Sequence, residues 1–354
     1  MFYNERGEQI VSYKHTRVWN VDKNKTIDDQ ALFLQESTMW IRENKLVAFP
    51  TETVYGLGAN ALSDDAVSQI FQAKGRPSDN PLIVHIGEKK QLHQLVEEIP
   101  DRAQCLMDAF WPGALTLIFK AKPVVAKNVT AGLSTVGIRM PSHPIAQVFL
   151  RDCQVPVAAP SANRSGRPSP TSAEHVLLDL DGRIDGVVDG GKTGIGLEST
   201  VLSIVEETPV LYRPGGVTKE EIEAVIGKIN VDRSLLNQKE QPKSPGMKYT
   251  HYAPEAAVYI VDDASQINSA ILAAQARGER VGVLAKHDYV QADESIVADS
   301  VQNLAHVLYE ALREFDKRGV SIILVEAVST SGVGEAVMNR LEKASGGKRL
   351  LERS

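Results

Sequence analysis

The segment Lys74-Gly75-Arg76-Pro77-Ser78-Asp79-Asn80-Pro81-Leu82-Ile83-Val84-His85 places two cations, a glycine and two prolines directly before an apolar run. The apolar run predicts a short buried strand, and the glycine and prolines predict an irregular segment in front of it. Two cations two positions apart in such a segment can point at one anion, which they could not do in a helix. Arginine offers a planar fork of donors that fits phosphate or carboxylate, and lysine offers a mobile point charge. The segment predicts an anion clamp at the edge of a sheet, and surface cations beside a turn are the equally weighted alternative.

Apolar runs of strand length recur through the first two thirds of the chain, with helical patterns of uneven length between them. Strands are predicted at 46–50, 82–86, 115–119, 136–139, 155–159, 186–189 and 200–204. A helix is predicted at 28–44, with core residues Leu32, Phe33, Met39, Trp40 and Ile41. Because helices and strands do not alternate regularly, the pattern predicts a mixed sheet in an α/β domain rather than a doubly wound one.

The last third of the chain has a different rhythm. Residues 237–246 are polar and contain proline, which is the composition of a linker. Beyond it, strands are predicted at 257–261, 280–285 and 320–325, and helices at 265–277, 301–318 and 334–344. This βαβαβα alternation predicts a small Rossmann-like domain with a parallel sheet and right-handed crossovers. No Gly-x-Gly-x-x-Gly follows its first strand, so no dinucleotide site is expected there.

Composition and charge narrow the classes of function. The 354 residues favour two domains, and the net charge of −6 leaves nucleic-acid contact only as a local feature. No apolar run reaches the roughly 18 residues of a membrane-spanning helix, and the first residues lack a signal-peptide pattern, so no membrane contact is expected. Cys105 and Cys153 lack metal-type spacing and are expected to be buried thiols, which makes a cytoplasmic protein the default.

Polar groups cluster after the first predicted strand. The segment Thr51-Glu52-Thr53-Val54-Tyr55-Gly56-Leu57-Gly58 places hydroxyls, a carboxylate and two glycines where ligands bind in α/β sheets. A tight turn whose threonine hydroxyls satisfy local backbone groups explains the same residues equally well. His85 lies within the next strand, where a lone histidine is more often a hydrogen-bonded core residue than a ligand.

Two later motifs place arginines beside strand ends. Arg139 ends the apolar strand of Ser134-Thr135-Val136-Gly137-Ile138-Arg139-Met140-Pro141, where a cation is costly unless an anion of the protein or of a substrate pairs with it. Ala159-Pro160-Ser161-Ala162-Asn163-Arg164-Ser165-Gly166-Arg167-Pro168 follows another strand. Its small residues permit close approach of a ligand, and its polar groups suit phosphate oxygens. A flexible surface loop is the less favoured alternative for the second motif.

The segments 196–201 and 211–216 add a hydroxyl pair, a carboxylate and an arginine at strand edges. The chain shows no convincing Ser-His-Asp constellation, no carboxylate pair and no phosphate loop of the Gly-x-x-x-x-Gly-Lys type. This inventory suits the binding of a nucleotide and a small amino or carboxylic acid, with chemistry by positioning and charge neutralisation.

Five motifs, in order and in spacing, resemble the threonylcarbamoyl-AMP synthase family, whose core has the YrdC/TsaC-like fold. They are residues 50–57, 74–77 with 80–82, 112–116, 137–141 and 160–166. The resemblance implies a mixed twisted sheet with a ligand groove over 26–216, and a Rossmann-like accessory domain over 257–350. Residues 217–256 would be the linker of the two-domain form and would carry a lid segment at 244–254.

The resemblance implies the synthesis of threonylcarbamoyl-AMP and pyrophosphate from L-threonine, bicarbonate or CO2, and ATP. This nucleotidyltransferase product would pass to the machinery that builds threonylcarbamoyladenosine (t6A) in transfer RNA, with a weak transfer-RNA contact as a further expectation. Mg2+ is expected on the phosphates of ATP, and no protein ligand is assigned to it.

The resemblance also implies roles for individual residues. Lys74, Arg76, Ser161 and Asn163 would form the central catalytic cluster. Thr53, His85, Arg139, Ser161 and Ser199 would bind L-threonine, with Arg139 on its carboxylate. Arg76, Asn80, Thr135, Asn163, Thr171, Arg213, Tyr249 and His251 would bind ATP. Tyr249, His251 and Tyr252 would close over the nucleotide as a lid that excludes water.

Two other functions fit parts of the sequence. An RNA-binding module could track a phosphate backbone in a cationic groove, but the acidic balance and the lack of aromatic residues among the basic ones disfavour it. A carbamoyl transferase that uses carbamoyl phosphate would need further domains, including one with a cysteine pattern that this chain lacks.

Overall fold

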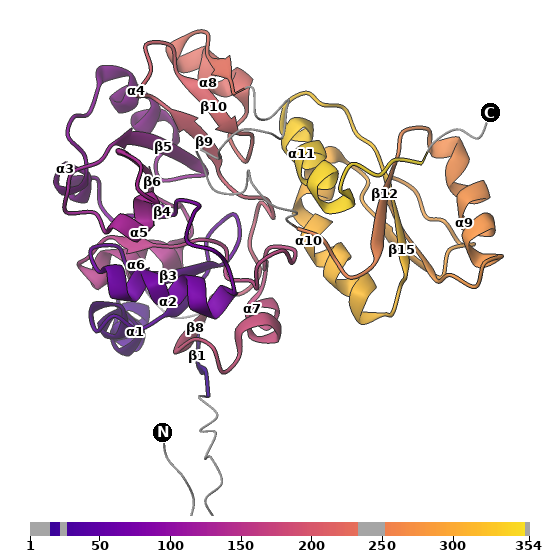
Figure 1. Ribbon diagram of the computed structural model, residues 1–354, viewed down its shortest axis with the longest axis horizontal. Helices are drawn as coiled ribbons and strands as arrows, with labels where there is room; N and C mark the ends of the chain where they lie inside the picture. Colours follow the sequence, from indigo (N-terminus) through magenta and orange to yellow (C-terminus); the bar gives the residue numbers. More distant parts are fainter. Residues whose placement is uncertain (1–14, 22–26, 233–251, 351–354) are drawn as a thin grey trace, which may run out of the picture.

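The computed structural model describes residues 15–21, 27–232 and 252–350, which form two lobes with one sheet in each (Figure 1). The larger sheet is mixed, in the order β1-β8-β2-β3-β7-β4-β6-β5-β9-β10-β11. Its strands are β1 Arg17–Asn20, β2 Val47–Phe49, β3 Gly56–Asn60, β4 Ile83–His85, β5 Leu115–Lys120, β6 Thr135–Arg139, β7 Val157–Ala158, β8 Gly186–Asp189, β9 Thr200–Ser203, β10 Val210–Arg213 and β11 Asn230–Val231. The predicted mixed α/β sheet is confirmed.

Helices cover this sheet unequally. They are α1 Ile27–Arg42, α2 Asp64–Lys74, α3 Leu92–Leu95, α4 Asp101–Phe110, α5 Lys127–Thr130, α6 Pro144–Cys153, α7 Ala173–Leu180 and α8 Lys219–Ile226. One face packs into the main core, in which Val67 and Ile70 of α2 and Leu106 of α4 meet strand residues such as Val84 and Leu117. This burial is the main stabilising term of the lobe.

The other face of the sheet is covered only in part. At one end α1 and α6 pack on it through Leu34, Ile41 and Phe149. Farther along the same face the apolar cluster is small, with Ile83, Ile118, Val201 and Tyr212 as its buried members. Strand residues alternate between faces, so residues two positions apart share a face. His85 therefore points to the same thinly covered face as Ile83 on β4, and Arg139 points to it from β6.

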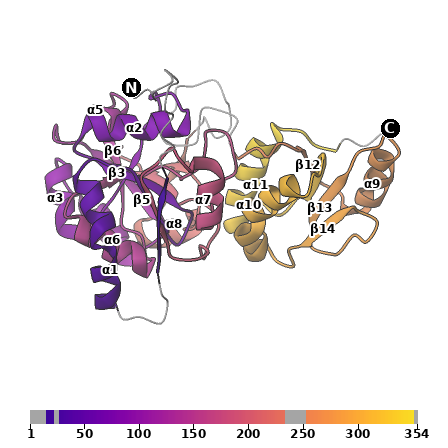
Figure 2. The same cartoon turned by 90° about the horizontal axis from the view of Figure 1, so that it is seen from below.

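The smaller lobe has a parallel sheet in the order β12-β15-β13-β14. Its elements are β12 Ala257–Val261, α9 Ile267–Gln275, β13 Val281–Ala285, β14 Glu294–Val297, α10 Val301–Lys317, β15 Ile322–Glu326 and α11 Val333–Ser345. Helices α10 and α11 lie on the side of this sheet that faces the larger lobe, and α9 lies on the far side (Figures 1 and 2). The predicted Rossmann-like alternation is confirmed, with β14 as an additional strand.

Two predictions about helices are wrong. Leu32, Phe33 and Met39 of α1 are exposed, because the buried stripe of this helix runs through Gln30, Leu34, Ser37, Thr38 and Ile41. Lys74 belongs to α2 rather than to an irregular segment, and the helix ends at Gly75 with a left-handed φ of 63°.

Cys105 is exposed, whereas Cys153 is buried as predicted. In the part of the chain that the structure describes, no helix is both long and apolar enough to cross a membrane. Most of the predicted lid segment at 244–254 lies outside the described residues, including Tyr249 and His251.

Candidate active site

A row of polar side chains crosses the thinly covered face of the larger sheet. His85 pairs in register with Arg139 on the parallel strand β6, and Arg139 pairs with Thr116 on the antiparallel strand β5. Thr116 continues the row, because its hydroxyl lies 2.8 Å from that of Ser199, which immediately precedes β9. The strand register therefore brings together four residues from a stretch of more than a hundred positions, from His85 to Ser199.

Arg139 is buried and is held by three groups of the protein. Its Nη2 lies 2.7 Å from Oε1 of Glu52, its Nη1 donates to Oγ1 of Thr53 at 2.8 Å, and its Nε donates to the carbonyl of Gly113 at 3.2 Å. Burial opposes ionisation of Glu52, but the Arg139 charge and the hydrogen bonds that the carboxylate accepts together lower the pKa of this carboxyl. The anion that the strand-end arginine requires is thus a protein carboxylate, and Arg139 also lines the pocket.

The loop after β7 forms one wall of the site and is fixed from beneath by Lys74. The Lys74 ammonium donates to the backbone carbonyl of Asn163 at 2.7 Å and to that of Ser161, and Oγ of Ser161 donates to Oδ1 of Asn163 at 2.5 Å. Burial, reinforced by the Arg76 charge, lowers the pKa of Lys74 well below its usual value. Lys74 therefore supports the loop from behind, while Arg76, Ser161 and Asn163 line the pocket.

Ser199 and Arg213 form the opposite wall. The guanidinium of Arg213 donates to the carbonyl of Ser199 at 3.0 Å through Nε and to its hydroxyl at 3.1 Å through Nη2. Arg213 is buried, and burial lowers its pKa. Tyr252, the first described residue after position 232, completes this side of the pocket and stacks on Tyr309 of α10 at a centroid distance of 5.2 Å.

These walls enclose about 670 Å³, including the solvent at the mouth. The charged and imidazole side chains on the lining are Arg76, His85, Arg139, Arg167, Glu198 and Arg213. Burial and the Arg139 charge lower the pKa of His85 to about 3, so this imidazole is neutral near pH 7. The lining therefore carries four cations against one carboxylate, and that carboxylate is paired with Arg340.

All five residues predicted for L-threonine line this pocket: Thr53, His85, Arg139, Ser161 and Ser199. Of those predicted for ATP, Arg76, Asn163 and Arg213 line it too.

Asn80, Thr135 and Thr171, which are also predicted for ATP, do not line this pocket. Asn80 is buried and accepts a hydrogen bond from Arg76 through its carbonyl at 3.3 Å. Thr135 lines a separate small hollow with Leu133 and Ile118. Thr171 is buried beside His175 at the start of α7. Tyr249 and His251 are outside the described residues.

The sequence reading missed several parts of this site. Arg167 belongs to a motif that was singled out, and Glu198 to a weaker one, but neither received a role. The sequence analysis also gives no role to Arg340 of α11, although its position within an apolar pattern indicates burial. Val337, Arg340, Leu341 and Ala344 follow helical spacing and are all buried, so a charged residue sits within an apolar stripe.

A mixed sheet whose open face gathers four arginines and several hydroxyls is the arrangement of an enzyme that holds anionic substrates together. Comparison with known proteins agrees. Residues 39–215 match the family model described as telomere recombination, and residues 217–346 match the model described as threonylcarbamoyl-AMP synthase, C-terminal domain.

Three relatives illustrate the match. The threonylcarbamoyl-AMP synthase of Bacillus subtilis is 53% identical over 94% of this chain and 99% of its own length. A crystal structure of Pyrococcus abyssi Sua5 complexed with L-threonine superposes with a TM-score of 0.90 at 47% identity, over 95% of this chain and 99% of that one. The threonylcarbamoyl-AMP synthase of Coxiella burnetii is 30% identical and matches 46% of this chain but 88% of its own length.

The chain belongs to the threonylcarbamoyl-AMP synthase family and is an enzyme of the nucleotidyltransferase type.

Proposed function

We propose that this chain makes threonylcarbamoyl-AMP and pyrophosphate from L-threonine, bicarbonate or CO2, and ATP in the pocket described above. The observation that carries the proposal is the convergence of Arg76, Arg139 and Arg213 on one pocket in a chain so similar to an L-threonine-bound relative. The product would feed the synthesis of t6A in transfer RNA, for which the cytoplasm is the expected compartment.

L-Threonine would bind at the Arg139 end. The guanidinium already spans Glu52 and Thr53, so an incoming carboxylate would share its charge with Glu52. Neutral His85 and the hydroxyl of Ser199 would orient the amine and the hydroxyl of the substrate without adding charge. Each of the three guanidinium nitrogens of Arg139 has a protein partner, so the planar fork is held in one orientation. A lysine ammonium, which is a mobile point charge, would fit this role less well.

ATP would bind along Arg76, Asn163 and Arg213. Asn80 would support it indirectly through its contact with Arg76, and Thr135 and Thr171 would act from outside the pocket wall. Tyr249 and His251 stay predicted lid residues. Mg2+ would enter with the phosphates of ATP, because this cation prefers oxygen ligands and commonly binds substrate phosphates.

The chemistry would proceed in two bond-forming steps. The threonine amine attacks CO2, forming an N–C bond and losing a proton, and a carbamate results. A carbamate oxygen then attacks the α-phosphorus of ATP, and the bond from that phosphorus to the bridging oxygen breaks as pyrophosphate leaves. Both partners of the second step are anions. At ~4 Å and an effective dielectric of about 20, each arginine contact offsets roughly 4 kcal/mol of this repulsion before desolvation.

The direct test is pyrophosphate release in the presence of ATP, Mg2+, L-threonine and bicarbonate. We expect release only in the complete mixture, with loss of signal when threonine or bicarbonate is omitted or Mg2+ is chelated. Carbamoyl phosphate in place of bicarbonate should not restore activity. Release that continues without threonine would identify a generic ATPase and refute the proposal.

A further inference from the structure

Two carboxylates of the larger lobe, Asp179 and Glu198, are buried and face the smaller lobe. The Asp179 side chain is 0% exposed and lies 2.8 Å from Nη2 of Arg313 on α10. The Glu198 side chain is 8% exposed and lies 2.9 Å from Nε of Arg340 on α11, which is itself 0% exposed. Each lobe therefore supplies one half of two buried ion pairs.

The Glu198–Arg340 pair lies directly behind the Ser199–Arg213 wall. Glu198 precedes Ser199 in the chain, and Nη1 of Arg340 donates to the carbonyl of Pro214, which follows Arg213, at 2.9 Å. Tyr309 and Ser169 complete the shell of Glu198 by donating their hydroxyls at 2.9 and 2.6 Å. Burial opposes ionisation of Glu198, but the Arg340 and Arg213 charges lower its pKa to about 2.

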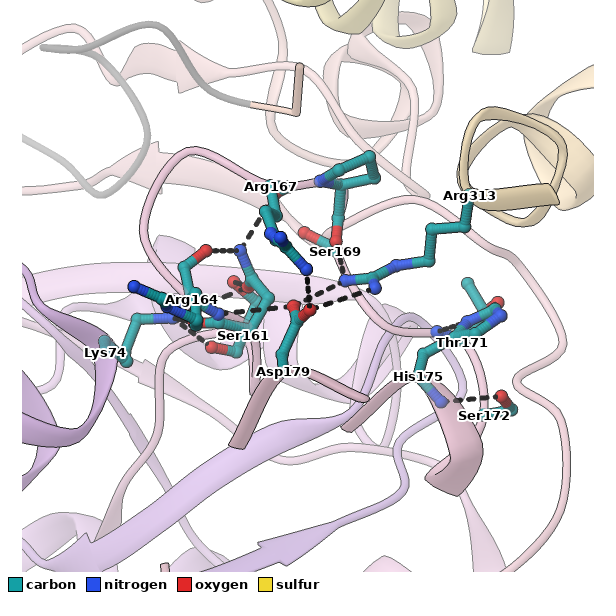
Figure 3. A network of polar contacts seen from close by, with 12 residues as sticks. Lys74, Ser161, Arg164, Arg167, Ser169, Thr171, Ser172, His175, Asp179 and Arg313 are labelled. Carbon is teal, nitrogen blue, oxygen red and sulfur yellow. Dashed lines mark hydrogen bonds and ion pairs between the residues drawn. The ribbon is translucent and has the colours of Figure 1, made fainter. Parts of the chain in front are cut away.

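The Asp179–Arg313 pair lies beside the other wall of the pocket, which is the loop after β7 (Figure 3). Asp179 accepts from Nη1 of Arg167 at 3.1 Å and from the backbone N–H of Arg164 at 3.3 Å, and Arg313 also donates to the carbonyl of Pro168. Asn163 Nδ2 donates to the carbonyls of Arg164 and Arg167 at 2.8 and 2.9 Å. The conformation of the 161–168 loop thus depends on a carboxylate that an arginine of the other lobe neutralises.

We propose that the smaller lobe completes the active site through Arg313 and Arg340, which are positioning residues for the two walls of the pocket. This inference rests on the proposed function for its substrates. It assigns the C-terminal lobe a role that the chemistry alone does not demand, because the Coxiella burnetii relative matches only about half of this chain. In this two-lobed chain, the carboxylates behind the pocket walls are neutralised by arginines of the smaller lobe.

The physical reason is the cost of an unpaired buried charge. Removing one partner of a buried pair is strongly destabilising, because it leaves an uncompensated charge in the protein interior. Loss of Arg340 would leave Glu198 to draw Arg213 toward itself or to turn toward solvent, and either change moves the Ser199 hydroxyl and the Arg213 fork.

The test compares Arg340→Met with a matched interface control, Lys192→Met. Lys192 pairs with Glu310 across the same interface at 2.5 Å, but it is exposed and does not line the pocket. Calorimetric titration would measure Kd for L-threonine and for a non-hydrolysable ATP analogue. We expect Arg340→Met to raise both Kd values tenfold or more, Arg313→Met to raise that of the analogue, and Lys192→Met to change neither by more than twofold.

A charge-matched double variant separates positioning from general damage. Glu198→Gln removes the charge that Arg340 neutralises, so Glu198→Gln/Arg340→Met should recover most of the affinity lost in Arg340→Met. Hydrogen exchange should quicken in Arg340→Met at 196–203 and 211–217 but not in the core around β4. If Arg340→Met does not fold, Arg340→Lys retains the charge without the fork and should give an intermediate Kd.

Unchanged Kd values in folded Arg340→Met or in Arg340→Lys would overturn this inference and leave the proposed function intact. Absence of rescue in the double variant would also overturn it, because Arg340 would then not act through the Glu198 charge. A wild-type chain that binds neither ligand would overturn the proposed function and the inference together.

Discussion

Lys74 and Arg76 are two positions apart and act on opposite sides of the same loop. Arg76 lines the pocket, whereas the Lys74 ammonium is buried and bonded to the carbonyls of Ser161 and Asn163. The cause of the division is Gly75, whose left-handed φ of 63° ends α2 between them and turns the chain. One cation lines the pocket, and the other fixes the loop that forms a wall of the pocket.

The two cations should therefore fail differently when removed. Arg76→Ala should lower kcat/KM by tenfold or more, a loss of at least about 1.4 kcal/mol of transition-state stabilisation, with little change in Tm. Lys74→Met should lower both activity and stability, because buried carbonyls left unsatisfied cost about 1–3 kcal/mol. Steady-state kinetics and thermal unfolding of both variants check this, and a normal Tm for Lys74→Met would contradict it.

His85 gives a prediction about acid stability. Burial and the Arg139 charge lower its pKa from about 6.5 to about 3 in the fold. Between these pH values the unfolded chain binds a proton at this site that the folded chain does not. The contribution of neutral His85 to the free energy of unfolding is therefore complete above pH 6.5. It is lost as the pH falls toward 3, at up to about 1.4 kcal/mol per pH unit.

His85→Gln should flatten this part of the stability curve. Urea unfolding between pH 7 and pH 4 measures it, with the slope in the variant smaller than in the wild type. Equal slopes would mean that His85 becomes protonated within the folded protein.

At the scale of elements, the pocket exists because helices cover one end of a sheet face and stop. Helices α1 and α6 bury Phe49 and Val157, and beyond them the same face presents His85 and Arg139. The apolar runs predicted these strands correctly. The order of the strands, which brings Ser199 beside Thr116, comes from long-range pairing that no local pattern encodes.

Helix α1 shows the limit of local patterns. Its buried stripe contains Gln30, Ser37 and Thr38, and the hydroxyl of Ser37 is satisfied within the helix by the carbonyl of Leu34 at 2.7 Å. Exposed Leu32 and Phe33 looked like core residues because hydropathy was the only guide. Arg340 shows the reverse case. A cation in the apolar stripe of α11 indicates a buried ion pair, because a fully buried arginine needs a partner of opposite charge.

Two glycines with similar φ values test the contact between the lobes. Gly196 and Gly227 have φ of 81° and 79°. A Cβ on Gly196 would lie 2.4 Å from the carbonyl oxygen of His306 in α10, whereas one on Gly227 meets nothing within 4 Å. Both changes to alanine place a side chain at a positive φ that L residues rarely adopt, so both carry backbone strain.

Gly196→Ala should in addition displace α10 from the larger lobe, and we expect a loss of activity that Gly227→Ala does not show. Kinetic assays of the two variants, with thermal unfolding as the reference for strain, measure the difference. Equal activity in both would show that the close approach at Gly196 has no bearing on the site.

At the scale of the molecule, the two lobes form one functional unit because buried charges of one are neutralised by the other. The pKa of Glu198 is about 2 in the fold against about 4.5 unfolded, so its contribution to stability is complete above pH 4.5 and is lost as the pH falls toward 2. The stability difference between wild type and Glu198→Gln should narrow as the pH falls from 5 to 3. Denaturant unfolding across that range measures it, and a difference independent of pH would contradict the pairing.

In the proposed reaction, one cationic pocket unites a threonine-derived carbamate with ATP. The most direct measurement of this reaction is mass spectrometry of the product formed from ATP, L-threonine and isotopically labelled bicarbonate. The predicted result is an adenylate that carries both threonine and the labelled carbon, formed in equal amount with pyrophosphate and lost in Arg76→Ala. Pyrophosphate accompanied only by unmodified AMP, or an adenylate without the label, would contradict it.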